Sequence, residues 1–184
     1  MHFVRETDVR RGVTELDEPR RFFQPDPLEY TAGETRYEVE PADELIIETN
    51  IHFKHPLIGE QRRELTVTRE PYLNEISRAR TFCFDFEVEA LKRQGLARGG
   101  SLDNAVVVGM DRIHNKEKSL RYPDEFVRHK TLDLIGDLFL LGAPLKARIK
   151  AHRVGHGHNV NLVKKLAAQM TGEAPSQTAV TSNY

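Results

Sequence analysis

The sequence is poor in cysteine, and this scarcity limits both its redox chemistry and its metal chemistry. Cys83 is the only cysteine among 184 residues, so the chain cannot form an intrachain disulfide framework. Such usage is typical of a reducing compartment, and we expect a cytoplasmic location. It also excludes a cysteine-rich zinc site, so a metal ion would need histidine and carboxylate ligands. No catalytic motif surrounds Cys83, which we interpret as a small buried core residue.

Long apolar runs and an excess of charge of one sign are also lacking. No apolar run reaches membrane-spanning length, and the first residues show no signal-peptide pattern. The 27 lysines and arginines nearly balance the 28 acidic residues, which gives a net charge of −1 without a long charged block. We therefore expect no transmembrane segment and no non-specific nucleic-acid binding as the main function. The length suits one ordinary domain with a hydrophobic core.

The sequence does contain a succession of strand-like and helix-like segments. Runs rich in β-branched and aromatic residues predict early strands at 28–32, 35–41, 44–53 and 62–68. The later patterns predict helices at 70–79, 84–95, 124–142 and 158–170, and strands at 104–109 and within 144–155. This order predicts an α+β fold, a two-layer domain with helices packed on a mixed or antiparallel sheet. The last segment, 171–184, lacks a core pattern and is predicted to be disordered.

The predicted helix DEFVRHKTLDLIGDLFLLG, residues 124–142, has two chemically different faces. One face carries apolar residues expected in the core, namely Val127, Leu134, Ile135, Leu138 and Phe139. The other places His129, Asp133 and Asp137 four residues apart, with Lys130 beside them. Side chains four residues apart lie about 5–6 Å from each other at Cβ, so a histidine and an aspartate can chelate one zinc ion. A solvated face with an ordinary histidine–aspartate hydrogen bond explains the same spacing.

A second polar cluster, HRVGHGHN at 152–159, follows the last predicted strand. Gly155 and Gly157 flank His156, and we expect them to let the backbone bend so that the imidazole projects into a cleft. The alternative is that His156 or His158 simply begins the last helix. Because consecutive elements usually pack as neighbours, the two polar clusters could form one site.

Three sequence blocks resemble the zinc-dependent UDP-3-O-acyl-N-acetylglucosamine deacetylase family of lipid A biosynthesis, in the family's order and spacing. They are ISRARTFCFDFEVEALKRQGLARGGSLDNAVVV, LRYPDEFVRHKTLDLIGDLFLLG and RVGHGHNVNLVKKL, with looser likeness at NIHFKHPLIG and FVRETDVRRGV. The resemblance implies a domain of an enzyme that removes the N-acetyl group from a UDP-linked acylated amino sugar. It implies a remnant of the interdomain segment at 1–25 and the carboxy-terminal deacetylase domain at 26–170.

The resemblance also assigns a role to each residue of the helical stripe. His129 and Asp133 match zinc ligands, and Lys130 matches a cation that stabilises the negative charge growing on the amide oxygen. Asp137 matches the aspartate that orients the histidine matching His156, which acts on the tetrahedral intermediate and the leaving amine. Zinc chemistry agrees with these roles, because zinc polarises carbonyls and lowers the pKa of bound water towards 7.

Thr81 and Phe82 fall in the block that, in this family, contributes substrate contacts and a hydrophobic passage for the acyl chain. The neighbouring apolar residues suit such a passage and an ordinary core helix equally well. These residues are Phe84, Phe86, Val88 and Leu91.

One part of the family pattern is missing from this chain. The first domain of the family brings a histidine ligand directly preceded by the glutamate that serves as general base, and no Glu-His dipeptide occurs here. We therefore expect the second domain only, as a fragment, a truncated product or half of a split enzyme. It would need a first domain in cis or in trans, and its metal-bearing face would leave Phe126 and Leu140 exposed. The alternative is a non-catalytic module that binds the sugar-lipid. His152 and His158 could replace the missing ligand, although their spacing does not favour this.

Overall fold

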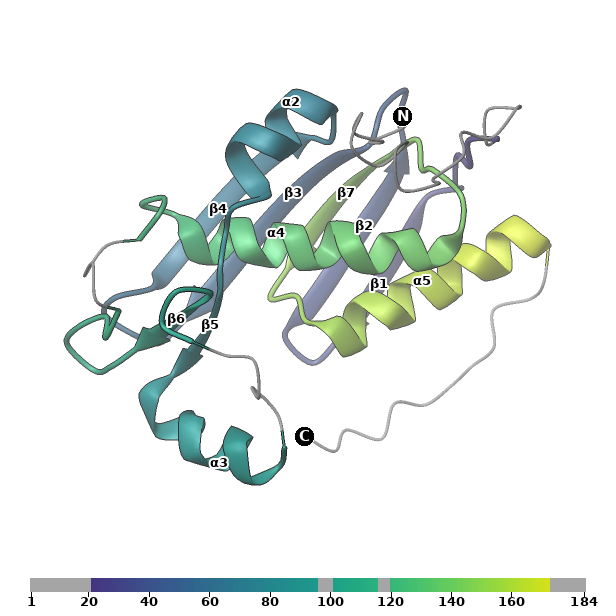
Figure 1. Cartoon of the computed structure of the whole chain (residues 1–184). Helices are drawn as coiled ribbons and strands as arrows, with labels where there is room; N and C mark the ends of the chain where they lie inside the picture. The colour runs from purple at the N-terminus through teal and green to yellow at the C-terminus, as the bar shows by residue number, and fades with distance from the viewer. Residues whose placement is uncertain (1–20, 96–100, 116–119, 173–184) are drawn as a thin grey trace, which may run out of the picture.

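The computed structural model describes residues 21–95, 101–115 and 120–172. The predicted remnant at 1–25, the predicted disordered tail at 171–184 and the family likeness at 3–13 lie wholly or mostly outside these ranges. Two long helices lie against one face of a five-stranded sheet, and a smaller unit lies near the β4 edge of that sheet (Figure 1). Within the described residues, no helix is both long and apolar enough to cross a membrane.

The main sheet is mixed, and its strand order places the last strand of the chain at its centre. Its strands are β1 (Leu28–Ala32), β2 (Thr35–Pro41), β3 (Ile46–Phe53), β4 (Gly59–Thr66) and β7 (Ala147–His152). The order is β1-β2-β7-β3-β4, with β7 parallel to β3 and every other neighbouring pair antiparallel. Helices on a mixed sheet confirm the predicted α+β class.

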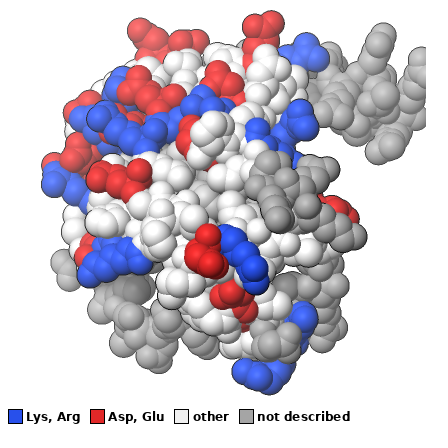
Figure 2. Space-filling view, turned by 90° about the vertical axis from the view of Figure 1, so that its left-hand side faces the viewer, with Lys and Arg blue, Asp and Glu red and all other residues white. Residues whose placement is uncertain are grey.

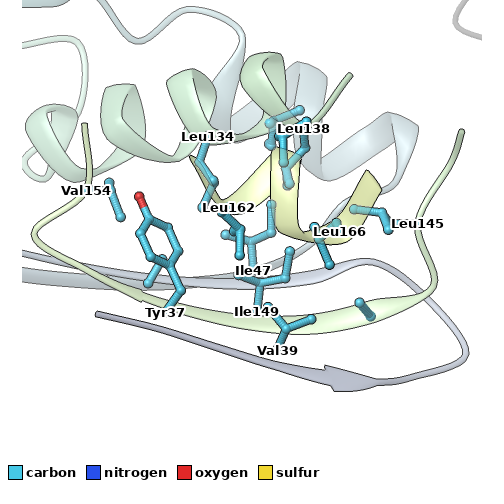
Figure 3. Close-up of a cluster of buried hydrophobic side chains, with 14 of the residues drawn as sticks. Tyr37, Val39, Ile47, Leu134, Leu138, Leu145, Ile149, Val154, Leu162 and Leu166 are labelled. Carbon is cyan, nitrogen blue, oxygen red and sulfur yellow. The ribbon is translucent and has the colours of Figure 1, made fainter. Parts of the chain in front are cut away.

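The main core lies between this sheet and two helices, α4 (Glu125–Leu138) and α5 (His156–Thr171). Strands β2, β3 and β7 alternate buried and more exposed residues, because only one face of the sheet is covered. Figure 3 shows the strand side chains meeting those of the helices, with Tyr37, Ile47 and Ile149 on one side and Leu134, Leu138, Leu162 and Leu166 on the other. This packing fixes α4 and α5 side by side.

The smaller unit contains a parallel pair of strands, β5 (Thr81–Phe84) and β6 (Ala105–Val108). Between them lie the 3₁₀ turn η2 (Asp85–Glu87) and α3 (Val88–Arg93). A second core joins this unit to α4 and the main sheet, with Ile51, Ile58, Val106, Val108, Phe126 and Val127 buried in it. Three shorter elements complete the described chain, namely α2 (Arg69–Pro71), the π-helix η1 (Tyr72–Ile76) and the 3₁₀ turn η3 (Phe139–Leu141).

Basic and acidic side chains are interspersed on the side of the molecule where β4 lies (Figure 2). Ion pairs account for part of this pattern. Arg62 lies 2.9 Å from Glu48, and Arg63 lies 3.0 Å from Asp124. The charges on this side are therefore neutralised locally and form no extended field of one sign.

Several sequence predictions differ from the structure in position. The helix predicted at 84–95 begins later, because Phe84 ends β5, a strand that was not predicted. Phe139 was assigned to the core but is 66% exposed, because α4 ends before it and the tighter 3₁₀ turn carries it off the buried stripe. Phe126 was expected to be exposed but is 1% exposed, because this end of α4 also faces the second core. Leu140 is 67% exposed, as predicted.

Candidate metal and catalytic site

The stripe on α4 brings His129 and Asp133 into contact. The Nε2 atom of His129 lies 3.2 Å from Oδ1 of Asp133, and both side chains are largely buried. Lys130 Nζ lies 3.2 Å from the other oxygen of the same carboxylate, Asp133 Oδ2. The helical spacing therefore produces the predicted cluster of an imidazole, a carboxylate and an ammonium group.

The other nitrogen of His129 faces the backbone. Its Nδ1 atom lies 3.4 Å from the carbonyl oxygen of Ala79, which can accept a proton carried by Nδ1. In that tautomer Nε2 and the Asp133 carboxylate face each other as acceptors, an arrangement suited to sharing a cation. Burial lowers the pKa of His129 below its ordinary value, although the nearby Asp133 carboxylate acts in the opposite direction. Burial thus favours the neutral imidazole, which is the form that binds a metal ion.

The chemistry of this donor set fits zinc, but its number of ligands is small. A histidine nitrogen and an aspartate oxygen are ordinary zinc ligands, whereas catalytic sites use three protein ligands and a water. Within the described residues, no group of three or more histidine, cysteine, aspartate or glutamate side chains could hold a metal. His156 Nε2 is 3.8 Å from Asp133 Oδ1, and its side chain is 67% exposed. This part of the chain therefore offers two donors, His129 and Asp133.

Asp137, one turn further along α4, contacts the start of α5. Its Oδ2 atom lies 2.8 Å from Nδ1 of His156, as the sequence predicted. His156 begins α5, as the alternative interpretation had it, and its imidazole also reaches Asp137 of the stripe. The stripe and the second polar cluster thus form one continuous group of polar side chains at the corner between α4 and α5.

The backbone bend before His156 has a different origin from the one predicted. Gly155 is extended, with φ of −161°, and Gly157 lies within the first turn of α5, so neither supplies a special backbone conformation. The left-handed residue is instead Arg153, with φ of 52°. Its backbone N–H donates to the Asn50 carbonyl at 2.9 Å and its carbonyl accepts from Thr35 Oγ1 at 2.8 Å. These bonds to β2 and β3 hold a conformation that is costly for a non-glycine residue.

Sequence analysis missed two residues of this site, Tyr37 and Asn159. The Tyr37 hydroxyl donates to Asn159 Oδ1 at 2.5 Å, and Asn159 Nδ2 donates to Asp137 Oδ2 at 2.8 Å. The available signals were weak, namely an asparagine three residues after His156 and a tyrosine on the buried side of a strand. Neither pattern indicates a contact between distant segments.

Phe82 reaches the stripe, whereas Thr81 does not contact it. The Phe82 ring centre lies 6.4 Å from that of His129, and Lys130 Nζ lies 5.7 Å from the same ring. Thr81 is exposed at the start of β5, and among the described residues no hydrogen bond or ion pair joins it to the stripe. Cys83 is only partly buried, which corrects the prediction of a buried core residue.

A buried ion pair anchors the segment that carries Ala79 and Phe82 to the start of α4. Glu125 is fully buried and accepts hydrogen bonds from the backbone N–H and Nε of Arg80, both at 2.9 Å, and from Nη2 of Arg80 at 3.1 Å. The backbone N–H of Arg121 donates to the same carboxylate at 2.6 Å. Burial alone would raise the pKa of Glu125, but these bonds outweigh burial and lower it. The ion pair thus fixes the position of the Ala79 carbonyl, which contacts His129.

A groove of about 700 Å³ opens next to the start of α5. Its lining includes the basic side chains of Lys54 and Arg153, together with Phe53 and His158. Arg153 forms an ion pair with Glu34, whose side chain is 82% exposed. The groove is therefore a partly basic hollow beside the polar corner.

Comparison with known proteins identifies the family of this chain. The family model LpxC, UDP-3-O-acyl N-acetylglycosamine deacetylase, matches residues 1–168. A UDP-3-O-acyl-N-acetylglucosamine deacetylase of Phenylobacterium zucineum is 47% identical over 91% of this chain and 57% of its own length, and one of Acidithiobacillus ferrooxidans is 46% identical over 84% and 52%. One of Anaeromyxobacter dehalogenans is 42% identical over 89% and 56%. The chain spans about half the length of these relatives. The predicted resemblance is thereby confirmed, and the chain belongs to the UDP-3-O-acyl N-acetylglycosamine deacetylase family.

Proposed function

We propose that this chain supplies half of the active site of a cytoplasmic, zinc-dependent deacetylase of lipid A biosynthesis. The reaction is hydrolysis of the N-acetyl amide of UDP-3-O-acyl-N-acetylglucosamine. The observation that carries the proposal is the convergence of two zinc-type donors, a lysine and an aspartate-bound histidine at one corner of the fold. Because the chain spans about half of its relatives, we infer that a first domain, in cis or in trans, supplies the remaining ligand and the general base.

Each polar side chain at this corner has a chemical task in the proposal. His129 and Asp133 hold the metal; zinc, when bound, acts as a Lewis acid toward the amide carbonyl and lowers the pKa of water. Lys130 places its ammonium where it stabilises the growing oxyanion. Asp137 holds Nδ1 of His156, which leaves Nε2 to deliver a proton to the departing amine.

Two neighbouring features suit the two ends of the proposed substrate. A path of aromatic rings leads away from the stripe, with centre-to-centre distances of 5.5 Å from Phe82 to Phe53, 6.1 Å from Phe53 to Phe84 and 5.4 Å from Phe84 to Phe86. Phe86 is 74% exposed, so this path opens to the surface and supports the assignment of Phe82 to an acyl passage. Thr81, at the start of the same strand, stays a predicted substrate contact.

The groove suits the nucleotide end of the substrate. Lys54 and Arg153 give it two cationic groups for a diphosphate. Arg153 is paired with the exposed Glu34, so an entering phosphate would replace that carboxylate. We therefore expect the substrate diphosphate to displace Glu34 from Arg153, so that the ion pair does not block substrate binding.

A second candidate function is a non-catalytic module that binds the sugar-lipid. The observation that favours it is that the described residues place only two zinc-type donors together at the site. A binding module has no need for the Asp137–His156 pair, so we rank it second.

An assay with the two halves supplied together tests the proposal. Alone, the purified chain is expected to bind zinc weakly and to release no acetate at a useful rate from the acylated UDP-sugar, because the general base contributes typically 10²–10⁴-fold. Adding the amino-terminal half of a close relative should restore deacetylation. His129→Ala in the mixture should abolish it, whereas His152→Ala, on the uncovered face of the sheet, should not. Turnover by the chain alone at the rate of a full-length relative would place the base within this chain, and substrate binding without turnover in the mixture would favour the module.

We also predict association through the exposed residues at the end of α4. Phe139 and Leu140 are 66% and 67% exposed, and adjacent apolar side chains of this size favour a partner surface. Sedimentation velocity over a concentration series should show self-association, or binding of the added amino-terminal half. The double substitution Phe139→Ser and Leu140→Ser should weaken this association. Phe86→Ser, equally exposed but on the smaller unit, serves as control, and a strictly monomeric chain that ignores the added half would contradict the prediction.

A further inference from the structure

We propose that Asn159 is a positioning residue, which fixes the Asp137 carboxylate and through it the imidazole of His156, and that Tyr37 in turn fixes Asn159. The catalytic consequence of this inference rests on the proposed function. The hydrogen-bonded arrangement itself stands apart from turnover and can be measured in the chain without substrate.

The imidazole of His156 is not held by packing. Its side chain is 67% exposed, and its one close hydrogen bond to the described part of the chain is the 2.8 Å contact between Nδ1 and Asp137 Oδ2. The direction of the ring therefore depends on where that carboxylate oxygen lies. Asp137 is itself only 16% exposed, and a second donor, Asn159 Nδ2, approaches the same oxygen at 2.8 Å. A carboxylate held by two donors at one oxygen cannot rotate without losing one of them.

The second donor is held from a different part of the fold. Asn159 and Tyr37 are both fully buried, and they come from α5 and β2. A buried amide is costly unless both of its ends are hydrogen-bonded, and here the carbonyl end accepts from the Tyr37 hydroxyl at 2.5 Å. Tyr37 thus ties Asn159, three residues after His156, to the sheet.

The hydrogen bonds of this network have a defined direction. If the amide of Asn159 were turned over, its oxygen would face the Asp137 carboxylate, and two acceptors would meet without a proton between them. The carboxylate therefore requires the NH₂ end of Asn159 to face it, and Tyr37 donates to the oxygen end. Since Asp137 is an acceptor, His156 carries its proton on Nδ1 and presents Nε2 to the site. The bonds from Tyr37 to Asn159 and from Asn159 to Asp137 run in one direction and polarise one another, which strengthens both.

The tautomer of His156 reports on this arrangement directly. Long-range ¹H–¹⁵N correlation spectra of the chain, recorded at a pH where the ring is neutral, distinguish Nδ1–H from Nε2–H. We expect essentially one form, Nδ1–H, in the unaltered chain. Asn159→Leu keeps a similar volume but removes the donor, and it should give a mixture in which the Nε2–H form is readily detected. In the enzyme assembled with an amino-terminal half, the same substitution should lower kcat about 10–100-fold and leave KM nearly unchanged.

Two further variants keep the test decisive. Asn161→Leu is the matched control, because Asn161 lies two residues further along α5 and donates to a tyrosine, Tyr30, at 3.3 Å without touching Asp137. It should leave the tautomer and kcat unchanged. Tyr37→Phe removes only the hydroxyl and should give a smaller change of the same kind, which preserves the test if Asn159→Leu fails to fold.

The outcomes separate this inference from the proposed function. A single Nδ1–H form in both Asn159→Leu and Tyr37→Phe would overturn the inference, and so would an equal change in Asn161→Leu. An altered tautomer in an assembled protein that shows no deacetylation in any form would sustain the positioning role and refute the proposed function. Normal deacetylation by an Asn159→Leu enzyme would refute the positioning role alone.

Discussion

Glu125→Gln is expected to lower the free energy of unfolding of this chain by about 3–5 kcal/mol, the cost of breaking a buried ion pair from one side. Glu125 is fully buried and Arg80 is 8% exposed, so the guanidinium would keep its charge in a place that water barely reaches. Domains of this kind are stable by only about 5–15 kcal/mol, so the loss is a large fraction of the total. Urea unfolding followed by circular dichroism measures it.

A surface pair provides the control for this substitution. Arg148 pairs with Glu64, whose side chain is 48% exposed, and exposed pairs of this kind contribute about 0–1 kcal/mol. Glu64→Gln should therefore leave the unfolding midpoint almost unchanged. Equal effects of the two substitutions would show that the Arg80–Glu125 pair is not the anchor of the β5 segment.

The effect of Glu125 also has a defined pH dependence. Its pKa is lowered in the folded state, because the bonds from Arg80 and Arg121 outweigh the cost of burial. The folded protein therefore binds this proton less readily than the unfolded chain, in which a glutamate has a pKa of about 4.3. The stabilisation is fully present above that unfolded-state pKa, and it is lost as the pH falls through the lower folded-state pKa. The difference in free energy of unfolding between the Glu125→Gln variant and the unaltered chain should thus become smaller as the pH is lowered.

His156→Ala is expected to lower kcat of the assembled deacetylase by about 10²–10⁴-fold, the usual contribution of a general acid or base. The side chain is 67% exposed and begins a helix, so its removal should leave the free energy of unfolding nearly unchanged. Acetate release under saturating substrate measures the effect. His152→Ala is the control, because that residue belongs to β7 on the uncovered face of the sheet.

Two results would contradict this assignment. A His156→Ala enzyme with nearly normal kcat would remove His156 from the chemistry and leave the contact with Asp137 as a structural bond. A large loss of thermal stability in the same variant would mean that the loss of activity reflects unfolding.

The sequence predicted best what depends on local spacing. His129, Asp133 and Asp137 repeat every four residues, so their common face follows from the helix alone, whatever surrounds it. Phe126 was misplaced because a helical wheel assumes one buried face, whereas α4 packs its start against the second core and its later turns against the main core. The strand β5 was missed because it has only four residues, too few to distinguish its pattern from the start of the following helix.

The support for the site depends on contacts between distant parts of the chain, which periodicity does not reveal. Tyr37 and Asn159 are 122 positions apart, and each alone reads as an ordinary buried residue. Arg153 similarly adopts a left-handed conformation because β2 and β3 hold its backbone. The sequence pattern instead placed the bend at the neighbouring glycines. Local pattern thus predicted the polar stripe on α4, and tertiary structure determines what orients its side chains.

The position of β7 at the centre of the sheet also has a consequence for biogenesis. Arg36 of β2 pairs with His152, and Ile46 of β3 pairs with Arg148, so the two hairpins meet only through a strand from late in the chain. During synthesis, the β1–β2 and β3–β4 hairpins therefore leave the ribosome before β7 does. The backbone edges of β2 and β3 that pair with β7 stay unpaired until that strand is made. Closing such distant pairings is slow, and the exposed edges invite strand exchange between nascent copies. We expect newly made chains to depend on chaperones until the central strand is inserted.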